Sequence, residues 1–363
     1  MSKNKIAATE IELKFLLGQT LDAKAVTEVL FREKFRFKQA QASLKNCYFD
    51  TPALDLARSD MGLRIRSLGA LYEQTIKTSG RVFSGLHQRP EYNIAFTHRQ
   101  AQTGPVLSLF PATIWLPGQD PVRIQSKLSA IFTTDFHRTS WTLDMGSGSV
   151  IELVLDTGLI SVMGSDINRQ AKIAEFELEL LSGSGPGATH ALIALAELLC
   201  RHFKLRPGLK SKAARGYALW LGAPEKEQQA LAFSEESFPG CPDREAFYSQ
   251  LQLALNKLQH GVEAFVLSAC SKHLVLVRQC LLFLAHVFEH GASCLPSRVI
   301  LPGAQLDEVI QSFMEKFTEA GLPGGERPGW DIQGMIDFFY GQNFNLLQLA
   351  LLKLLLEKVQ LSE

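Results

Sequence analysis

The stretch ATEIELKFLL, residues 8–17, alternates charged side chains at Glu10, Glu12 and Lys14 with apolar ones. Strict alternation is typical of a β-strand that has one apolar face. Because side chains two positions apart share a face of a strand, the three charges must project together. This face must therefore meet either water or a charged ligand.

The same grouping of charges recurs along the first half of the chain. It is found at Arg64 and Arg66 in LRIR, at Arg89, Glu91 and Asn93 in RPEYN, at Glu152 and Asp156 in IELVLD, and at Glu175, Glu177 and Glu179 in EFELEL. For any one strand, a solvated outer face is the simpler interpretation. Three carboxylates in a row repel one another, however, unless a cation lies among them. In a barrel with these faces inward, a metal–polyphosphate complex would complement both signs of charge.

Length, charge and periodicity divide the chain into two parts. At 363 residues it exceeds the usual single domain, and residues 1–221 carry a net charge of +7 whereas residues 222–363 carry −7. The polar, Pro- and Gly-containing segment 222–242 is the expected linker. Helical periodicity fills 243–363, and helices are also expected at 22–35 and 187–203. Seven alternating runs are expected to be strands: EIELKFLL, LRIRSL, YEQTIKTS, RPEYNIAF, FHRTSWTLD, VIELVLDTGLI and AEFELELL.

These patterns predict an α+β protein, in which antiparallel strands with two helices among them are followed by an all-α helical bundle. The first ten residues lack the apolar core of a secretory signal, and the six cysteines show no paired spacing. We therefore expect a cytoplasmic protein. The apolar run at 273–288 is interrupted by Arg278 and His286 and is short for a bilayer, so it predicts a buried helix and no membrane association.

EIELK resembles the ExExK signature of the CYTH family, the triphosphate tunnel metalloenzymes. The agreement continues in order through NCYFDTP, LRIR, TIK, RPEYN, FHRTSW, IELVLDTG, FELEL and LKSKAARGY. It covers about residues 8–221. The resemblance therefore implies that 1–221 is a tunnel domain, an antiparallel closed β-barrel with flanking helices. The resemblance implies a metal-dependent inorganic triphosphatase that uses Mg²⁺ or Mn²⁺ to cleave triphosphate, or a related polyphosphate, to diphosphate and phosphate.

The resemblance also implies roles for individual residues. The implied metal ligands are Glu10, Glu12, Glu175, Glu177, Glu179 and Asp156. The implied catalytic and substrate-binding residues are Lys14, Arg64, Arg66, Lys77, Arg89, Arg138 and Lys212, with Lys210 as an alternative phosphate contact. Lys212 is preferred over Lys210 because its Ser-Lys context matches the family better. Asp156 and Glu91 could instead orient a neighbouring arginine, and Arg215 could be structural.

Several functions remain open beside the inorganic triphosphatase. They are a CYTH-type adenylate cyclase, a thiamine or nucleoside triphosphatase, and a non-catalytic polyphosphate-binding protein. No tunnel motif suggests recognition of an organic group, so the bare triphosphate is preferred as substrate. Binding alone would not require so many carboxylates, so an enzyme is preferred over a binding protein. No Ser, Cys or His nucleophile is needed for this chemistry, and no nucleic-acid partner is expected.

KHLVLVRQCLLFLAHVF resembles the first helix of the CHAD domain, a helical module associated with polyphosphate. His273 and Val277 match its pattern, but apolar residues replace its basic positions, at Leu276, Cys280, Leu281 and Phe283. Residues 243–363 are therefore expected to be a degenerate CHAD-like domain. Because this half is acidic, we expect it to bind polyanions weakly and to serve packing or homodimer formation.

Overall fold

The computed structural model describes residues 5–83, 85–146, 148–164, 169–222, 238–319 and 331–360. The chain divides into two compact units. The first comprises Met1–Lys14, Asp22–Ser182 and Lys210–Lys226, and the second comprises Phe15–Leu21, Gly183–Leu209 and Glu227–Glu363. Gly183–Leu209, which precede the predicted boundary at residue 221, thus belong to the second unit. Most of the predicted linker, residues 223–237, lies outside the described residues.

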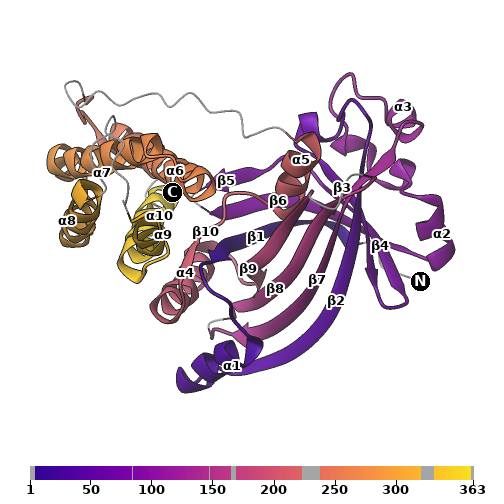
Figure 1. Cartoon of the computed structure of the whole chain (residues 1–363), viewed down its shortest axis with the longest axis horizontal. Helices are drawn as coiled ribbons and strands as arrows, with labels where there is room; N and C mark the ends of the chain where they lie inside the picture. The colour runs from indigo at the N-terminus through magenta and orange to yellow at the C-terminus, as the bar shows by residue number, and fades with distance from the viewer. Residues whose placement is uncertain are drawn as a thin grey trace. The chain divides into compact units, whose positions relative to one another are not determined.

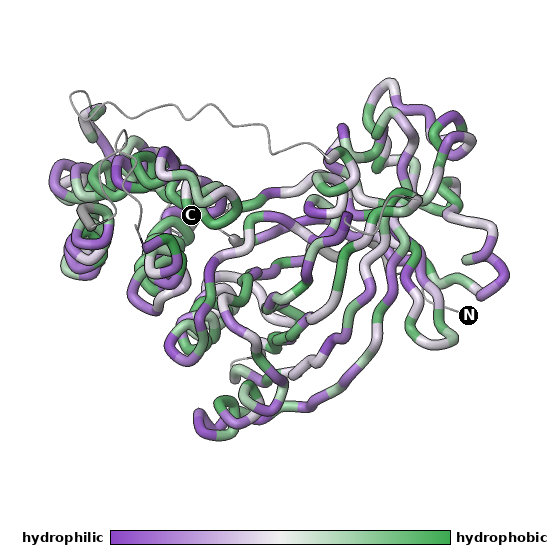
Figure 2. The backbone as a smooth tube through the Cα atoms, in the orientation of Figure 1, coloured by the Kyte–Doolittle hydropathy of each residue, from purple (hydrophilic) through white to green (hydrophobic). Residues whose placement is uncertain are grey.

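A closed barrel of eight strands forms the first unit, which confirms the predicted fold class (Figure 1). Around the barrel the strands run β1 (Lys5–Leu17), β9 (Gln170–Ser182), β8 (Val150–Val162), β7 (Ser129–Asp144), β2 (Phe37–Asp50), β3 (Gly62–Leu68), β4 (Leu71–Lys77) and β6 (Leu86–Phe96). Pairing of β1 with β6 closes the ring, and short β5 (Arg81–Phe83) extends β6. Hydrophilic and hydrophobic stretches alternate along the long strands (Figure 2).

All seven predicted strands form, but β2 was missed as a strand. Its burial alternates only from Leu44 onward, and its first half is largely exposed, so the sequence there lacks an apolar face. The predicted helix at 22–35 is α1 (Ala23–Arg32), which begins where the Asp22 side chain accepts a hydrogen bond from the Ala25 backbone N–H. It ends before Lys34, whose φ of 62° is left-handed.

Apolar residues of the barrel wall face outward and are covered by connecting segments. Leu63 and Ile76 alternate with Arg64 and Lys77 and lie in a core cluster outside the lumen. The cover includes the 3₁₀ turns η1 (Ala57–Ser59), η2 (Leu107–Leu109) and η3 (Ala112–Ile114), with the short helices α2 (His98–Thr103) and α3 (Pro121–Gln125) nearby. Since the apolar face is buried outside, the polar face is left for the interior.

Helix α5 (Lys212–Leu221) packs against β7, β8 and β9. The sequence motif LKSKAARGY predicted a basic contact here but not a helix. The Ser211 side chain caps α5 by accepting a hydrogen bond from the Ala214 N–H at 3.1 Å. Gly216 is required by packing, because a Cβ there would lie 2.2 Å from the Phe132 ring. This arrangement fixes Lys212 in the first turn.

The second unit is helical. It contains α4 (Gly185–His202), α6 (Arg244–Ser268), α7 (Lys272–Gly291), η5 (Ala292–Cys294), α8 (Gly303–Glu319), α9 (Ile332–Phe339) and α10 (Gln342–Gln360), with β10 (Leu205–Pro207) paired to Phe15–Leu17. Helix α6 packs along α7, and α10 contacts α4, α6 and α8. The predicted helix at 187–203 is therefore α4.

Helix α7 carries the segment that resembles CHAD. Cys280, Leu281 and Phe283, where the resemblance expects arginine, are at most 1% exposed and pack in the helical core. Among the described residues, one helical segment, Lys272–Cys294, is long enough and apolar enough to cross a membrane. Half of its most apolar 18-residue stretch is buried inside the protein. Core helices of water-soluble proteins pass the same test, so this feature is weak evidence for a membrane.

Candidate active site

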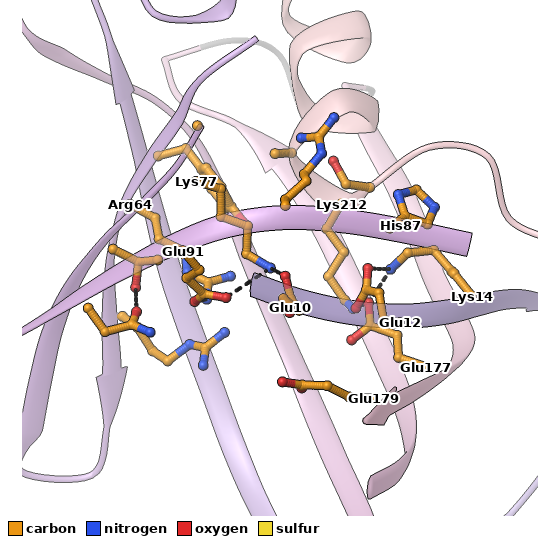
Figure 3. Close-up of a pocket in the computed structure, with 18 of the residues that line it drawn as sticks. Glu10, Glu12, Lys14, Arg64, Lys77, His87, Glu91, Glu177, Glu179 and Lys212 are labelled. Carbon is orange, nitrogen blue, oxygen red and sulfur yellow. Dashed lines mark hydrogen bonds and ion pairs between the residues drawn. The ribbon is translucent and has the colours of Figure 1, made fainter. Parts of the chain in front are cut away.

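The barrel encloses a cavity of about 270 Å³ in the first unit (Figure 3). Among the described residues, its lining includes seven carboxylates and seven lysines or arginines. The acidic residues are Glu10, Glu12, Glu73, Glu91, Glu152, Glu177 and Glu179, and the basic residues are Lys14, Arg64, Arg66, Lys77, Arg89, Arg138 and Lys212. The charged strand faces therefore point inward, and the simpler reading of solvated outer faces is wrong for them.

Strand register explains why these side chains meet. Across β1 and β6, Glu10 lies opposite Arg89 and Glu12 opposite His87. Across β8 and β9, Glu152 lies opposite Glu179. Since directly opposed side chains share a face of the sheet, each inward residue brings its cross-strand partner into the cavity.

One group of charges connects β1, β3, β4 and β6. Lys77 pairs with Glu10 and, at 3.2 Å, with Glu91, which also pairs with Arg64 at 3.5 Å (Figure 3). Burial alone would raise the pKa of Glu91, but Lys77 and Arg64 outweigh it and lower the pKa to about 2. Glu91 is therefore ionised at neutral pH and holds the two bases in place.

A second group is buried between β7, β8, β9 and α5. Asp156 accepts two hydrogen bonds from Arg138, both at 2.7 Å, and pairs with Lys212 at 2.6 Å. Glu177 pairs with Arg138 and with Lys212, each at 2.9 Å. Glu175 pairs with Lys212 and Arg215, both at 2.5 Å. Carboxylate oxygens of Asp156, Glu175 and Glu177 lie within 4.8 Å of one another, but bases already surround them.

Lys14 is enclosed by this second group. It pairs with Glu177, with Glu175 at 3.2 Å and with Glu12 at 3.8 Å. Burial opposes its charge, but the carboxylates, led by Glu175, raise the pKa of Lys14 well above its ordinary value. An ammonium with a raised pKa cannot act as a general base at neutral pH. Lys14 can neutralise or bind anions here but cannot deprotonate water.

A third group consists of carboxylates whose negative charge is not fully balanced by neighbouring lysine or arginine side chains. Glu179 has no ion pair or hydrogen bond to any described residue, and burial together with Glu10 and Glu12 raises its pKa to about 8. Burial also raises the pKa of Glu10, although Lys77 partly offsets this. Glu10 and Glu12 from β1 and Glu179 from β9 reach the same part of the cavity (Figure 3). Hard oxygen donors that repel one another fit a Mg²⁺ or Mn²⁺ ion.

The basic side of the cavity has an excess of positive charge. Burial, followed by repulsion from Arg64 and Arg138, lowers the pKa of Arg66 to about 10. Arg66 donates to Asn46 Oδ1 at 3.0 Å, which leaves its other N–H groups available. The Nε atoms of Arg64 and Arg89 are buried without a hydrogen-bond partner among the described residues. Clustered guanidinium groups with unused donors are suited to phosphate oxygens.

The predicted site residues divide into those that line the cavity and those behind its wall. The lining contains Glu10, Glu12, Glu177, Glu179, Lys14, Arg64, Arg66, Lys77, Arg89, Arg138 and Lys212. Asp156 and Glu175 are completely buried and are not in the lining. Lys210 is half-buried just before α5 and is likewise not in the lining, whereas Lys212 is.

Several lining residues were missing from the predicted set. They are Tyr48, Glu73, Thr75, His87 and Phe136, whereas Asn93 and Glu152 were recognised on charged strand faces but were given no role. Spacing contained the signal for most of them, because Glu73 and Thr75 share a strand face with Lys77, and His87 shares one with Arg89. Tyr48 could not be found in this way, since β2 was not recognised as a strand.

Parts of the chain resemble known proteins in sequence or in fold. An inorganic triphosphatase from Haemophilus influenzae is 35% identical over 244 residues, which cover 63% of this chain and 64% of the relative. The chain thus spans less than two thirds of that curated relative. A solved Hippeastrum protein, studied as an adenylyl cyclase and described with a dominant triphosphatase activity, is 18% identical over 58% of this chain and 95% of its own, with a TM-score of 0.38. A solved inorganic triphosphatase is 20% identical over 51% and 81%, with a TM-score of 0.21.

Family membership rests on the sequence match rather than on these distant structural likenesses. The CYTH domain matches residues 8–217, which include most of β1, all of β2 to β10, and α5 up to Tyr217. The match ends before the C-terminal helices, so their likeness to CHAD stays a prediction. With its eight-stranded barrel and inward-facing charges, the chain belongs to the CYTH domain family.

Proposed function

We propose that the protein is a metal-dependent inorganic triphosphatase that hydrolyses triphosphate to diphosphate and phosphate inside the barrel. The observation that supports this most strongly is the meeting of carboxylates in excess with arginines in excess inside one cavity. A metal ion would neutralise the excess of carboxylates, and a chain of phosphates would neutralise the excess of arginines. Membership of the CYTH family and the name of the Haemophilus relative support the same activity.

We assign Mg²⁺ or Mn²⁺ binding to Glu10, Glu12 and Glu179, with Glu177 at the edge of this set. Their carboxylate oxygens are hard donors, and Glu179 has no ion pair with any base among the residues that the structure describes. When bound, the ion would polarise phosphate oxygens and lower the pKa of a coordinated water. Asp156 and Glu175 carry ion pairs to several bases, so their proposed role is to orient Arg138 and Lys212.

The remaining chemistry belongs to the basic side chains. Arg64, Arg66 and Arg89 would bind phosphate oxygens and hold the chain in line for attack by water. Arg138 and Lys212 are fixed by Asp156, so they can neutralise charge on the leaving diphosphate with little reorganisation. Protonated Lys14 balances the charge of Glu177 and Glu175.

The dimensions and lining of the cavity favour a bare triphosphate over a nucleotide or thiamine ester. A volume of about 270 Å³ is below the ~300–1,000 Å³ common for drug-sized ligands. Phe136 is buried, and the charged groups of Arg138 and Lys212 lie 5.7 and 5.0 Å from its ring centroid. The buried ring is therefore not available to stack on a base.

A phosphate-release assay tests the proposed substrate. With Mg²⁺ or Mn²⁺, we expect kcat/KM for inorganic triphosphate to exceed that for ATP and thiamine triphosphate by at least about 100-fold. Chelation of the metal with EDTA should stop release. Preference for ATP or thiamine triphosphate would favour those alternatives, and tight binding without turnover would favour a polyphosphate-binding protein.

The pKa of Glu179 predicts how metal-free stability depends on pH. Its folded pKa of about 8 lies above its ordinary value of 4.5, so the associated stability is present below pH 4.5 and is lost as pH rises through 8. Glu179→Gln removes this loss. In EDTA, we expect the variant to be more stable than the wild type by on the order of 1–2 kcal/mol at pH 8.5 and nearly equal at pH 4.5.

Urea unfolding at the two pH values measures this difference. Mg²⁺ should reverse the order, because the ion stabilises the wild type more than a variant that lacks one ligand. Equal stability of the two proteins at pH 8.5 in EDTA would show that Glu179 is not repelled by its neighbours.

We also propose a cellular location and an assembly for the protein. The six cysteines are free thiols, which supports a reducing, cytoplasmic location. A homodimer through the helical unit stays a proposal, testable by sedimentation of the full chain.

A further inference from the structure

We propose that Asp60 is a positioning residue that holds the Arg89 guanidinium at the rim of the cavity, where Arg89 binds one end of the triphosphate. The inference deepens the proposed function and rests on it. Asp60 belongs to the connection between β2 and β3 and is not part of the cavity lining. It lies just after η1, in a segment that no charged-face pattern singled out.

Arg89 differs from the other arginines of the cavity in its partner. Arg64 pairs with Glu91, and Arg138 pairs with Asp156, both inside the barrel or its wall. Arg89 lines the cavity from β6, yet its Nη2 donates to Asp60 Oδ1 at 3.1 Å. The Asp60 side chain is 52% exposed and that of Arg89 is 21% exposed, so the pair lies where the cavity meets solvent.

The backbone around Asp60 fixes the direction of its side chain. Asp60 is left-handed, with φ 53° and ψ 37°, and its N–H donates to the Ala57 carbonyl at 3.0 Å. The preceding turn is tied down by the buried Asp50 carboxylate, which accepts from the N–H groups of Leu56 and Ala57. Leu56 is fully buried, which anchors the turn further. Asp60 is thus presented to Arg89 by a rigid turn.

A second contact confines the stem of Arg89. A Cβ added to Gly80 would lie 2.3 Å from Arg89 Cγ and 2.3 Å from the Gln88 carbonyl. The backbone at Gly80 therefore lies against the stem, while Asp60 holds the guanidinium. Arg89 Nε is buried without a hydrogen-bond partner among the described residues, so the guanidinium keeps an unsatisfied donor in addition to its pair with Asp60.

A contribution to folding does not explain this pair. Ion pairs this exposed contribute little to stability. Their effect on a long side chain is to restrict its rotamers before a ligand arrives, so that less conformational entropy is lost on binding. The half-exposed Asp60 also stays outside the cavity and does not repel a phosphate chain inside it as strongly as a lining carboxylate would.

Binding of the imido analogue of triphosphate, whose P–N–P bridges resist hydrolysis, tests the inference. Calorimetry with Mg²⁺ compares the wild type, Asp60→Asn, Arg89→Ala and the double variant. Asparagine tolerates the left-handed backbone but lacks the charge. Asp60→Asn should weaken binding about three- to tenfold, and Arg89→Ala about 10- to 100-fold. The double variant should match Arg89→Ala within about twofold.

Asp135→Asn is the matched control, because it removes a carboxylate from another exposed pair, Lys45–Asp135. It should bind within about twofold of the wild type. With triphosphate itself, Asp60→Asn should raise KM by the same factor as the binding constant and change kcat less than about twofold.

Unchanged or tighter binding by Asp60→Asn would overturn the inference, as would an equal loss in the Arg89→Ala background. A wild type that shows the expected binding pattern but releases no phosphate would contradict the proposed enzyme and keep the role of Asp60. A wild type that does not bind the analogue would overturn both.

Discussion

Replacing Glu10 with glutamine is expected to lower metal-dependent release of phosphate from triphosphate by at least about 10²–10³-fold. Glutamine keeps the size of the side chain but lacks the charge that would hold the ion with Glu12 and Glu179. The fold should survive, since Lys77 retains Glu91 as a partner at 3.2 Å. Initial rates across a titration of Mg²⁺ or Mn²⁺ measure the effect.

The matched control is Glu28→Gln on α1, which removes a carboxylate from an exposed helical pair with Lys24. Its rate and melting temperature should equal those of the wild type. Full activity of Glu10→Gln at every metal concentration would remove Glu10 from the proposed metal site.

Replacing Asp156 with alanine is expected to destabilise the protein by about 3–5 kcal/mol. Asp156 is completely buried, accepts two hydrogen bonds from Arg138 and pairs with Lys212. Without it, Arg138 and Lys212 lose a partner at a completely buried position of the wall. Urea unfolding in EDTA measures the loss directly.

Asp135→Ala serves as the control on the neighbouring strand β7, where the carboxylate is exposed, and should change stability by less than about 0.5 kcal/mol. The comparison also distinguishes two roles for Asp156. If Asp156→Ala unfolds like the wild type in EDTA but is no longer stabilised by Mg²⁺, Asp156 is a metal ligand and does not orient Arg138.

The two acidic groups of the cavity therefore differ in what balances them. Asp156, Glu175 and Glu177 lie among bases of the wall, so their oxygens are close together without requiring an ion. Glu179 has no such partner among the described residues, and its raised pKa reflects this. Proximity of carboxylates alone would favour Asp156, Glu175 and Glu177 as the metal site, whereas the balance of charge favours Glu10, Glu12 and Glu179.

Much of the barrel could be predicted from the sequence because alternation is a local property. Glu10, Glu12 and Lys14 share a face wherever the strand lies, and so do Arg64 and Arg66. Alternation fails in the exposed half of β2, and that strand was missed. The family resemblance then supplied what alternation could not, namely that these faces point into a closed barrel.

Partner choice inside the cavity could not be predicted, because it depends on register between strands far apart in the sequence. Lys77 meets Glu10 only through the pairing of β4 with β6 and of β6 with β1. The contact of Asp60 with Arg89 depends on a left-handed residue in a turn, for which the sequence offered no periodic signal. Both contacts can be identified only from the three-dimensional structure.

The most direct test of the central claim is the coupling between metal and phosphate binding in the cavity. Calorimetry with the imido analogue, with and without Mn²⁺ or Mg²⁺, measures it. If carboxylates and arginines act on one metal–triphosphate complex, the ion should tighten analogue binding by at least about tenfold, and the analogue should tighten ion binding by the same factor. Affinities that do not depend on each other would contradict the account.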